Sequence, residues 1–335
     1  GKEHAPNIDV NAIGRLTVVK SASALQYGGD AMGGIVIAEG LKVPVKDTLY
    51  GKTMLSGASN GRGGVLTSQL TKSHKNGWYG TAQSTLKRFG DVESADYVMS
   101  NTGLMEKDLS LRLGLNRFNH GLEAYYAYYN TEIGILRSSH AHGAADQIRA
   151  IESNVPLTIR EFTYDIGYPK QNFTHHLARI KAFKKFNNFG QLSLQYDYQN
   201  NHRFEYDIRV GNDRDKPALD LKLDTHTVLL DFKIRFYDLN FKSGIMGRFQ
   251  TNFANPDTGV RRLIPDYDKY DFGIYAVLDK KIIDKLEIET GVRFDYSYMD
   301  VFKFYKNSVW EERGYDILFP DLIVQEFSNQ VLVNP

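Results

Sequence analysis

The chain alternates between apolar and polar residues over most of its length. Leu109, Leu111, Leu113 and Leu115 form one row, and polar or small residues occupy the positions between them. Because only a pleated strand places successive side chains on opposite faces, this pattern predicts strands with one oily and one wet face. It predicts about eleven such strands, at roughly residues 48–58, 65–73, 78–89, 104–117, 122–136, 173–186, 191–209, 219–236, 241–253, 268–280 and 285–300.

Short and long connections between these strands also alternate. Short turns rich in Asn and Gly fall at residues 74–77, 119–121, 187–190, 237–240 and 282–284, and longer connections at 90–103, 137–172, 210–218 and 254–267. Aromatic residues lie beside the short turns, at Trp78, Tyr79, Phe118, Phe186, Phe189, Phe236, Tyr237 and Phe241. Short turns on one rim, long loops on the other and an aromatic girdle are typical of outer-membrane barrels. The predicted fold class is therefore all-β, a transmembrane antiparallel β-barrel.

Composition narrows the classes of function. The 335 residues include 41 basic and 40 acidic ones and no cysteine. A nucleic-acid-binding surface would need a basic excess, which is missing. No apolar run approaches the ~20 residues of a membrane helix. The mean hydropathy of −0.41 does not oppose a barrel, because only every second strand residue meets lipid.

Residues 13–41 differ from the alternating part. Residues 13–20 predict a short buried strand, and residues 21–27 a helical turn with Ser21 as its N-cap. Four glycines punctuate residues 28–34, and the apolar run 35–38 follows. These glycines lack the Gly-Lys-Ser/Thr that a phosphate-binding loop requires, so tight turns explain them better.

Residues 13–37 resemble the end of the plug domain of TonB-dependent outer-membrane receptors. In that family a strand, a basic residue, a small-residue segment, a Gly-Gly pair and a β-branched strand precede the barrel. Ser21 stands where the family usually has Gly, and the last strand runs into Ala38 and Glu39 rather than Thr. Further segments resemble ferric-siderophore receptors, namely residues 161–165, 169–171, 174–177, 217–221, 225–227 and 259–265.

The resemblance implies a plug end over residues 1–44 and the first half of a barrel of about 22 strands over residues 45–335. The first residue is Gly1, and residues 333–335 do not read as a closing strand, so we expect an internal piece of a larger protein. The implied function is active uptake of a ferric siderophore through the outer membrane, with outer-membrane lipid around the barrel. TonB, ExbB and ExbD would drive it through a TonB box outside this chain. Receptors for haem, cobalamin or a glycan, a passive porin or adhesin, and a soluble β-rich binding domain are the alternatives.

Candidate ligand-binding residues lie in the long loop at 137–172. Arg137, Arg149, Arg160 and Tyr164 offer the cations and the aromatic ring that suit an anionic, catecholate-like ferric complex. A solvated loop carries such residues without binding anything, and this simpler interpretation stays open. Lys20 is a candidate plug–barrel contact, with Glu287 or Glu289 as its expected partner.

No metal site, cofactor or catalytic centre is predicted. His140, His142, His175 and His176 are possible metal ligands, but His175 and His176 are strand neighbours and face opposite ways. Two acidic groups, Asp213 with Asp215 and Asp266 with Asp268 and Asp271, match no complete calcium loop. Neither a nucleophile elbow nor a zinc-protease motif occurs, so the chain is not expected to be an enzyme.

Overall fold

The computed structural model describes residues 8–139, 143–187, 190–209, 211–260, 263–283, 285–304, 324–326 and 330–334. Its main feature is a thirteen-stranded antiparallel sheet in which sequence neighbours pair. Eleven of the strands are β3 (Thr48–Ala58), β4 (Gly63–Ser73), β5 (Trp78–Phe89), β8 (Leu104–Asn116), β9 (His120–Gly134), β10 (Lys170–Phe186), β11 (Gly190–Tyr206), β12 (Leu219–Phe236), β13 (Leu239–Ala254), β14 (Asp266–Ile283) and β15 (Leu286–Phe304). These are the predicted strands, and all are confirmed.

Two short strands continue the sheet beyond β15. Both β16 (Val324–Glu326) and β17 (Gln330–Asn334) pair antiparallel with β15. Residues 333 and 334 belong to β17, which pairs with β15 and not with β3 at the other edge, so they form a strand but not one that closes the sheet into a barrel. The backbone edge of β15 supplies the pairing, and such pairing does not require a long alternating pattern.

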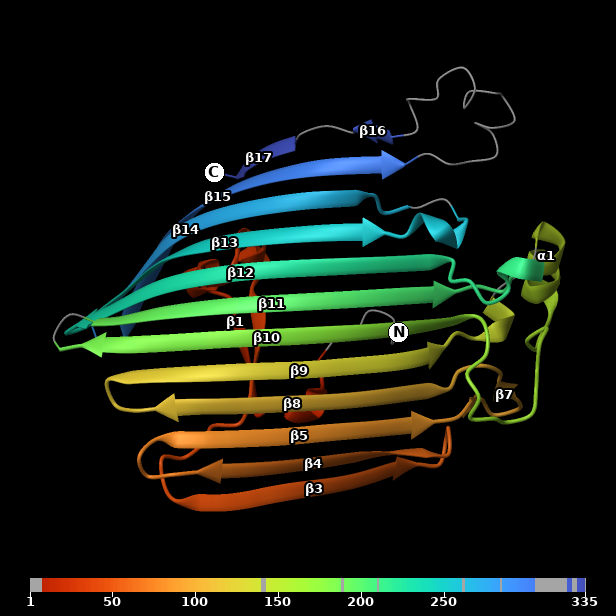
Figure 1. Ribbon diagram of the computed structural model, residues 1–335, viewed down its shortest axis with the longest axis horizontal. Helices are drawn as coiled ribbons and strands as arrows, with labels where there is room; N and C mark the ends of the chain where they lie inside the picture. Colours follow the sequence, from red (N-terminus) through yellow and green to blue (C-terminus); the bar gives the residue numbers. More distant parts are fainter. Residues whose placement is uncertain are drawn as a thin grey trace.

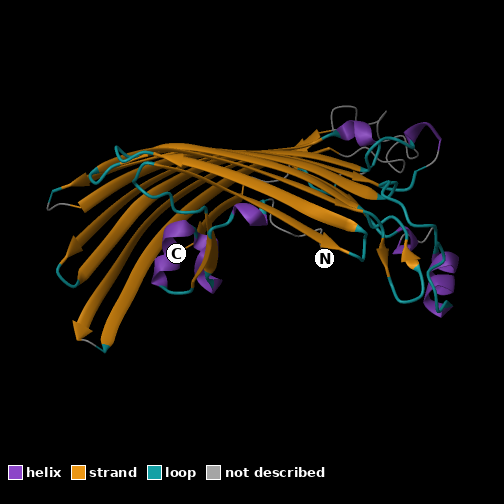
Figure 2. Ribbon diagram, turned by 90° about the horizontal axis from the view of Figure 1, so that it is seen from below, coloured by secondary structure: helices purple, strands orange, loops and turns teal. Residues whose placement is uncertain are grey.

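The sheet curves into an arch with different connections at its two ends (Figures 1 and 2). Short turns join the strands at one end. At the other end lie the 3-10 turns η5 (Arg137–Ser139), η6 (Gly211–Asp213) and η7 (Pro256–Thr258), the two-stranded sheet of β6 (Val92–Glu93) and β7 (Val98–Met99), and the helix α1 (Ala144–Glu152). In the described part of the chain, no helix has the length and apolar character that crossing a membrane requires.

The oily rows lie on the convex face of the arch. Leu109, Leu111 and Leu113 are 40%, 43% and 66% exposed, whereas Asp108, one residue before this row, is 6% exposed. Asp108 faces the concave side, which holds residues 8–41. The alternation therefore places apolar side chains outside and polar ones inside, as a barrel in a membrane requires.

A line of rings crosses the convex face near the long connections. Tyr198, His226, Phe249, Tyr270 and Tyr298 are direct cross-strand partners on β11 to β15. Neighbouring rings have centroids 4.9–6.4 Å apart. The sequence analysis did not predict this line, because it depends on the register between strands.

The height of the apolar band between this line and the short turns matches that of the lipid-facing zone of a membrane barrel. On β12, ten residues separate His226 from the exposed Phe236 beside the short turn. With a rise of about 3.3 Å per residue and a strand tilt of about 40°, this distance spans about 25 Å along the barrel axis. Aromatic rings thus border both edges of a band as tall as the lipid-facing zone of a barrel.

Residues 8–41 lie on the concave side of the arch (Figure 2). They form η2 (Val10–Ala12), η3 (Ala22–Tyr27), η4 (Gly29–Gly33) and an antiparallel pair of strands, β1 (Arg15–Val19) and β2 (Ile35–Glu39). The predicted strand and helical turn are present, but the Ser21 side chain makes no capping hydrogen bond. The expectation of a buried strand is wrong. Leu16, Val18 and Val36 are 61%, 59% and 62% exposed, because no described segment packs over that face of the pair.

Candidate functional site

The plug seam, defined as the contacts of residues 9–41 with the concave face, is built from polar groups. On β15, Arg293 is 8% exposed, and its Nη1 donates to the carbonyl oxygen of Leu25 at 2.8 Å. Its Nε and Nη2 donate to the Asp295 carboxylate at 2.7–2.9 Å. The backbone N–H of Ser23 donates to Glu289 on the same strand. Strand β15 therefore holds η3 through directional hydrogen bonds.

A second arginine contacts the end of the segment. Arg112 on β8 donates from Nη1 to the carbonyl oxygen of Leu41 at 3.2 Å. A Cβ added to Gly40 would lie 1.8 Å from Nη2 of Arg112, so the approach depends on glycine or on movement of the guanidinium. Glu123 lies 3.8 Å from Nε of Arg112 and accepts a hydrogen bond from the Tyr79 hydroxyl at 2.5 Å.

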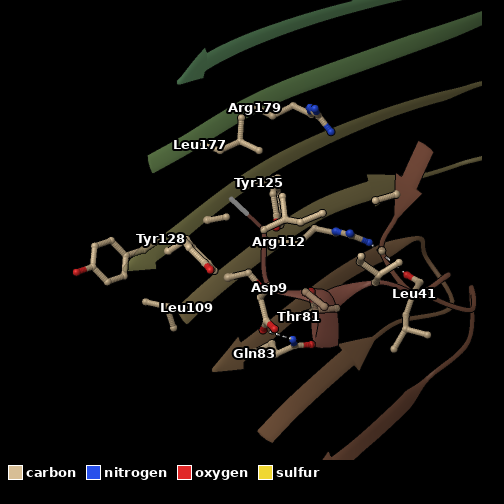
Figure 3. A pocket seen from close by; sticks show the side chains of 18 of the residues that line it. Asp9, Leu41, Thr81, Gln83, Leu109, Arg112, Tyr125, Tyr128, Leu177 and Arg179 are labelled. Carbon is tan, nitrogen blue, oxygen red and sulfur yellow. Dashed lines mark hydrogen bonds between the residues drawn. The ribbon is translucent and has the colours of Figure 1, made fainter. Parts of the chain in front are cut away.

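A cavity of about 240 Å³ lies between residues 8–41 and strands β5, β8, β9 and β10 (Figure 3). Asp9 marks one side of it, and its Oδ2 accepts from Gln83 Nε2 at 2.9 Å and from Thr85 Oγ1 at 2.7 Å. A wider space of about 990 Å³ is lined by residues 35–43 and by the inner faces of β11 and β12. The plug seam thus fills only part of the concave side.

Lys20 does not make the predicted ion pair. It follows β1, is exposed, and forms no salt bridge with Glu287 or Glu289, all three being described residues. Glu289 does contact this segment, but through the N–H of Ser23. A backbone donor has no sequence signature, so side-chain charge was the only signal from which a partner could be predicted. A plug–barrel role for Lys20 itself stays a prediction.

The four candidate ligand residues do not form one cluster. Arg137 donates to the carbonyl oxygen of Tyr168 at 3.1 Å, and partial burial together with the nearby cation of Arg160 lowers the pKa of Arg137. Within the described residues, the exposed Arg160 guanidinium has no hydrogen bond or ion pair. Arg149 pairs with Asp146 on α1, away from the strands. The Tyr164 hydroxyl donates to the carbonyl oxygen of Arg62 at 2.6 Å.

Asn101 holds both ends of the long connection, and the sequence analysis missed it. Its Nδ2 donates to the carbonyl oxygens of Ile135 at 2.8 Å and Pro169 at 2.7 Å. Its Oδ1 accepts from the N–H of Gly167 at 2.8 Å, and its own φ is +65°. Asparagine tolerates this left-handed conformation better than most residues. The only signal in the sequence was an Asn two positions before a glycine, Gly103, in a long connection.

Among the described residues, the histidines and aspartates considered above do not come together as metal ligands. His175 lines the cavity beside Asp9, whereas His176 bonds the Tyr126 hydroxyl on the convex face, so the two face opposite ways as predicted. Asp271 is engaged by Arg248 and Ser297, and Asp213 by Lys216. His140 and His142 lie outside the described residues.

Comparison with known proteins finds similarity in structure only. No protein-family model matches the sequence, and no curated protein sequence matches it. The solved structures with similar folds include the ferric-catecholate import receptor Fiu from E. coli K12 (TM-score 0.66, 12% identity, 95% of this chain and 55% of that chain). The FrpB iron transporter from Neisseria meningitidis (TM-score 0.65, 14% identity, 88% and 51%) and the copper transporter OprC (TM-score 0.67, 12% identity, 99% and 47%) are also similar.

These similarities establish the fold. The chain spans about half the length of the structures it matches. The predicted transmembrane β-barrel wall is confirmed, and the resemblance to TonB-dependent receptors is confirmed at the level of the fold. The similar structures are receptors and transporters rather than enzymes, and one is the outer membrane receptor FauA from Bordetella pertussis.

Proposed function

We propose that this chain is the plug end and first half of the barrel of a TonB-dependent outer-membrane receptor that imports a ferric siderophore. Residues 1–44 belong to the plug and residues 45–335 to the barrel. The observation that carries the proposal is the plug seam, in which the buried Arg293 of the wall binds the Leu25 carbonyl of the segment inside. A passive porin needs no segment held in this way.

A polar seam suits a plug that has to move. The hydrogen bonds of Arg293, Arg112 and Glu289 all involve a charged group and exchange with water at a net cost of about 1.5–3 kcal/mol each. Separating an apolar interface of similar size would instead expose oily surface to water. In the proposed mechanism, TonB with ExbB and ExbD pulls on the plug, the seam opens, and the ligand passes along the polar concave face.

The ligand class rests on the charges of the long connection. Arg137 and Arg160 lie close enough for the cation of Arg160 to lower the pKa of Arg137, while the nearby carboxylate of Asp207 acts on that pKa in the opposite direction. Two close cations favour an anion between them, as a catecholate ferric complex would supply. Tyr164 borders the same connection. Because a copper transporter has a similar fold, the barrel alone does not show whether the ligand contains copper or iron.

Uptake by cells tests this proposal. A strain lacking the receptor, complemented with the full-length protein, is expected to accumulate a labelled ferric catecholate only when TonB is active. Arg160→Glu should weaken ligand binding by about 10-fold or more, since a hydrogen bond to a charged group contributes about 1.5–3 kcal/mol. The matched reversal Arg149→Glu should have the smaller effect, because Asp146 already neutralises Arg149.

Two results would contradict the proposal. Equal accumulation with and without TonB would indicate a passive pore. TonB-dependent accumulation of copper but not of the ferric complex would support the transporter function and contradict the ferric siderophore as its ligand.

A further inference from the structure

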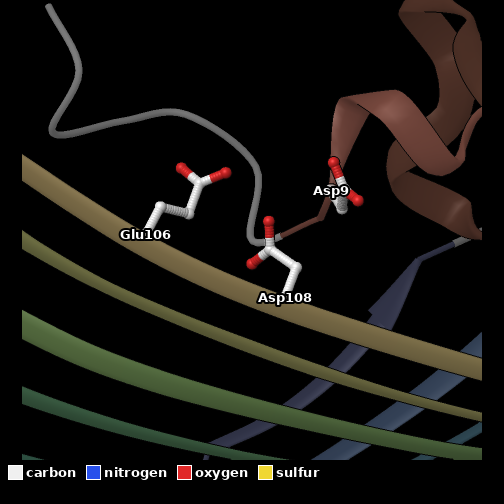
Figure 4. A group of neighbouring side chains, drawn as sticks. All are labelled: Asp9, Glu106 and Asp108. Carbon is white, nitrogen blue, oxygen red and sulfur yellow. The ribbon is translucent and has the colours of Figure 1, made fainter. Parts of the chain in front are cut away.

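Three carboxylates meet where the segment at Asp9 crosses the barrel wall (Figure 4). Asp9 comes from the N-terminal side of η2, and Glu106 and Asp108 come from the concave face of β8. One carboxylate oxygen from each residue lies within 4.8 Å of the others. Among the residues that the structure describes, no other three side chains of the usual metal-binding types are placed this way.

Two of the carboxylates are already oriented by hydrogen bonds. Asp9 Oδ1 accepts from the N–H and Nδ2 of Asn11 at 2.9 and 3.0 Å, and Oδ2 accepts from Gln83 and Thr85. Glu106 accepts from Lys87 through Oε1 and from the Tyr129 hydroxyl through Oε2 at 3.2 Å. These donors fix the positions of both groups, which preorganises the cluster.

Asp108 is the exception. It is 6% exposed, and neither of its carboxylate oxygens accepts a hydrogen bond from any described residue. A buried carboxylate without a partner is costly, so such a group in a folded protein needs an explanation. Asp108 points toward Asp9 and Glu106, the two groups that would repel its negative charge most.

The charge of the cluster matches a divalent cation. Three carboxylates carry −3 when ionised, and Lys87, which pairs with Glu106, offsets one of these charges. Ca²⁺ binds oxygens at about 2.3–2.6 Å, so oxygens on opposite sides of one ion are at most about 5 Å apart. The spacing of up to 4.8 Å found here lies within that limit. The described ligands are all oxygens, which favour Ca²⁺ or Mg²⁺ over softer metals.

We infer that Asp9, Glu106 and Asp108 form a binding site for a hard divalent cation that ties the plug segment to the barrel wall. The ion would complete the coordination of Asp108 and use waters from the adjoining cavity, which Asp9 and Tyr129 also line. Because Asp9 belongs to one side and β8 to the other, losing the ion would leave carboxylates repelling across the seam. This inference does not depend on which ligand the receptor imports.

Calcium titration of the full-length protein tests the inference. Detergent-purified protein is stripped with EDTA and titrated calorimetrically with Ca²⁺ alone. The wild type is expected to bind one Ca²⁺ at this site. Asp108→Asn should weaken this binding by more than about 10-fold, since even changes outside the ligand shell typically cost about 10–100-fold. Glu132→Gln is the matched control, because Glu132 lies on the next strand and pairs with Lys170 at 2.7 Å.

Thermal melting of the same three proteins gives a second measurement. EDTA should lower the melting temperature of the wild type and of Glu132→Gln but leave that of Asp108→Asn unchanged, because this variant has lost the ion already. A wild type that binds no Ca²⁺ above the Asp108→Asn background, or whose melting ignores EDTA, would overturn the inference. Equal binding by Asp108→Asn and the wild type would also overturn it.

Discussion

Replacing Arg293 by alanine is expected to loosen the plug and open a leak through the barrel. The side chain of Arg293 is 2% exposed, and that of its partner Asp295 is 19% exposed. Removing one member of a buried ion pair typically costs about 3–5 kcal/mol, because the other charge stays buried without compensation. The variant also loses the hydrogen bond to the Leu25 carbonyl, which holds η3 against β15.

Conductance of the full-length protein in planar bilayers measures this effect. The Arg293→Ala protein should pass ions in bursts and should melt at a lower temperature than the wild type. Arg248→Ala is the matched control, since Arg248 pairs with Asp271 at 2.8 Å on the neighbouring strand and forms no hydrogen bond or ion pair with the described residues 9–41. A closed Arg293→Ala protein with wild-type melting would show that the seam does not hold the plug.

Placing a charge on the apolar band is expected to lower the stability of the folded protein, because this band faces the lipid. Ile274 on β14 is 49% exposed and lies between Ile245 and Phe294, four residues from Tyr270 in the line of rings. An arginine near the bilayer midplane costs a barrel about 2–4 kcal/mol. Ile274→Arg should lower the free energy of unfolding in lipid vesicles by about this amount.

The control uses an isoleucine that is even more exposed. Ile151 on α1 is 82% exposed within the long connection, where the proposed arrangement places water. Ile151→Arg should leave the free energy of unfolding within about 0.5 kcal/mol of the wild type. Equal effects at the two positions would mean that the convex face does not meet lipid.

The barrel wall was predictable because its signal is local. Leu109, Leu111 and Leu113 share a face with a period of two residues, and any strand with that period fixes its two faces. Turns such as residues 74–77 revealed the ends of the strands through Asn and Gly. Local composition does not show which residues lie opposite each other, so the line from Tyr198 to Tyr298 was found only in the structure.

The candidate site was less predictable because its contacts join distant parts of the chain through backbone atoms. Arg293 meets a carbonyl oxygen 268 positions earlier, and Asn101 meets three backbone groups of another connection. A carbonyl or N–H group is the same in every residue, so it leaves no trace in the sequence. The same limit explains why charge led to Lys20 as the partner of Glu289 when the N–H of Ser23 takes that place.

The pattern of alternation also explains why Asp108 was overlooked. Beside a row of leucines, Asp108 looks like any polar residue of a wet barrel face, and such residues are routinely solvated. Glu106 lies two positions away on the same face of β8, and the crossing of the Asp9 segment adds the third carboxylate. A residue of ordinary appearance thus becomes unusual through a segment about one hundred positions earlier in the sequence.

The most direct test of a membrane barrel with a wet interior is spin labelling of adjacent residues on β11. The chain has no cysteine, so single cysteines at Leu194 and Gln195 carry the label without background. Leu194 is 49% exposed on the convex face, and Gln195 lines the wide space inside. In lipid vesicles, oxygen should relax the label at 194 more strongly, and a water-soluble nickel complex the label at 195. Equal access of the nickel complex to both positions would contradict the account.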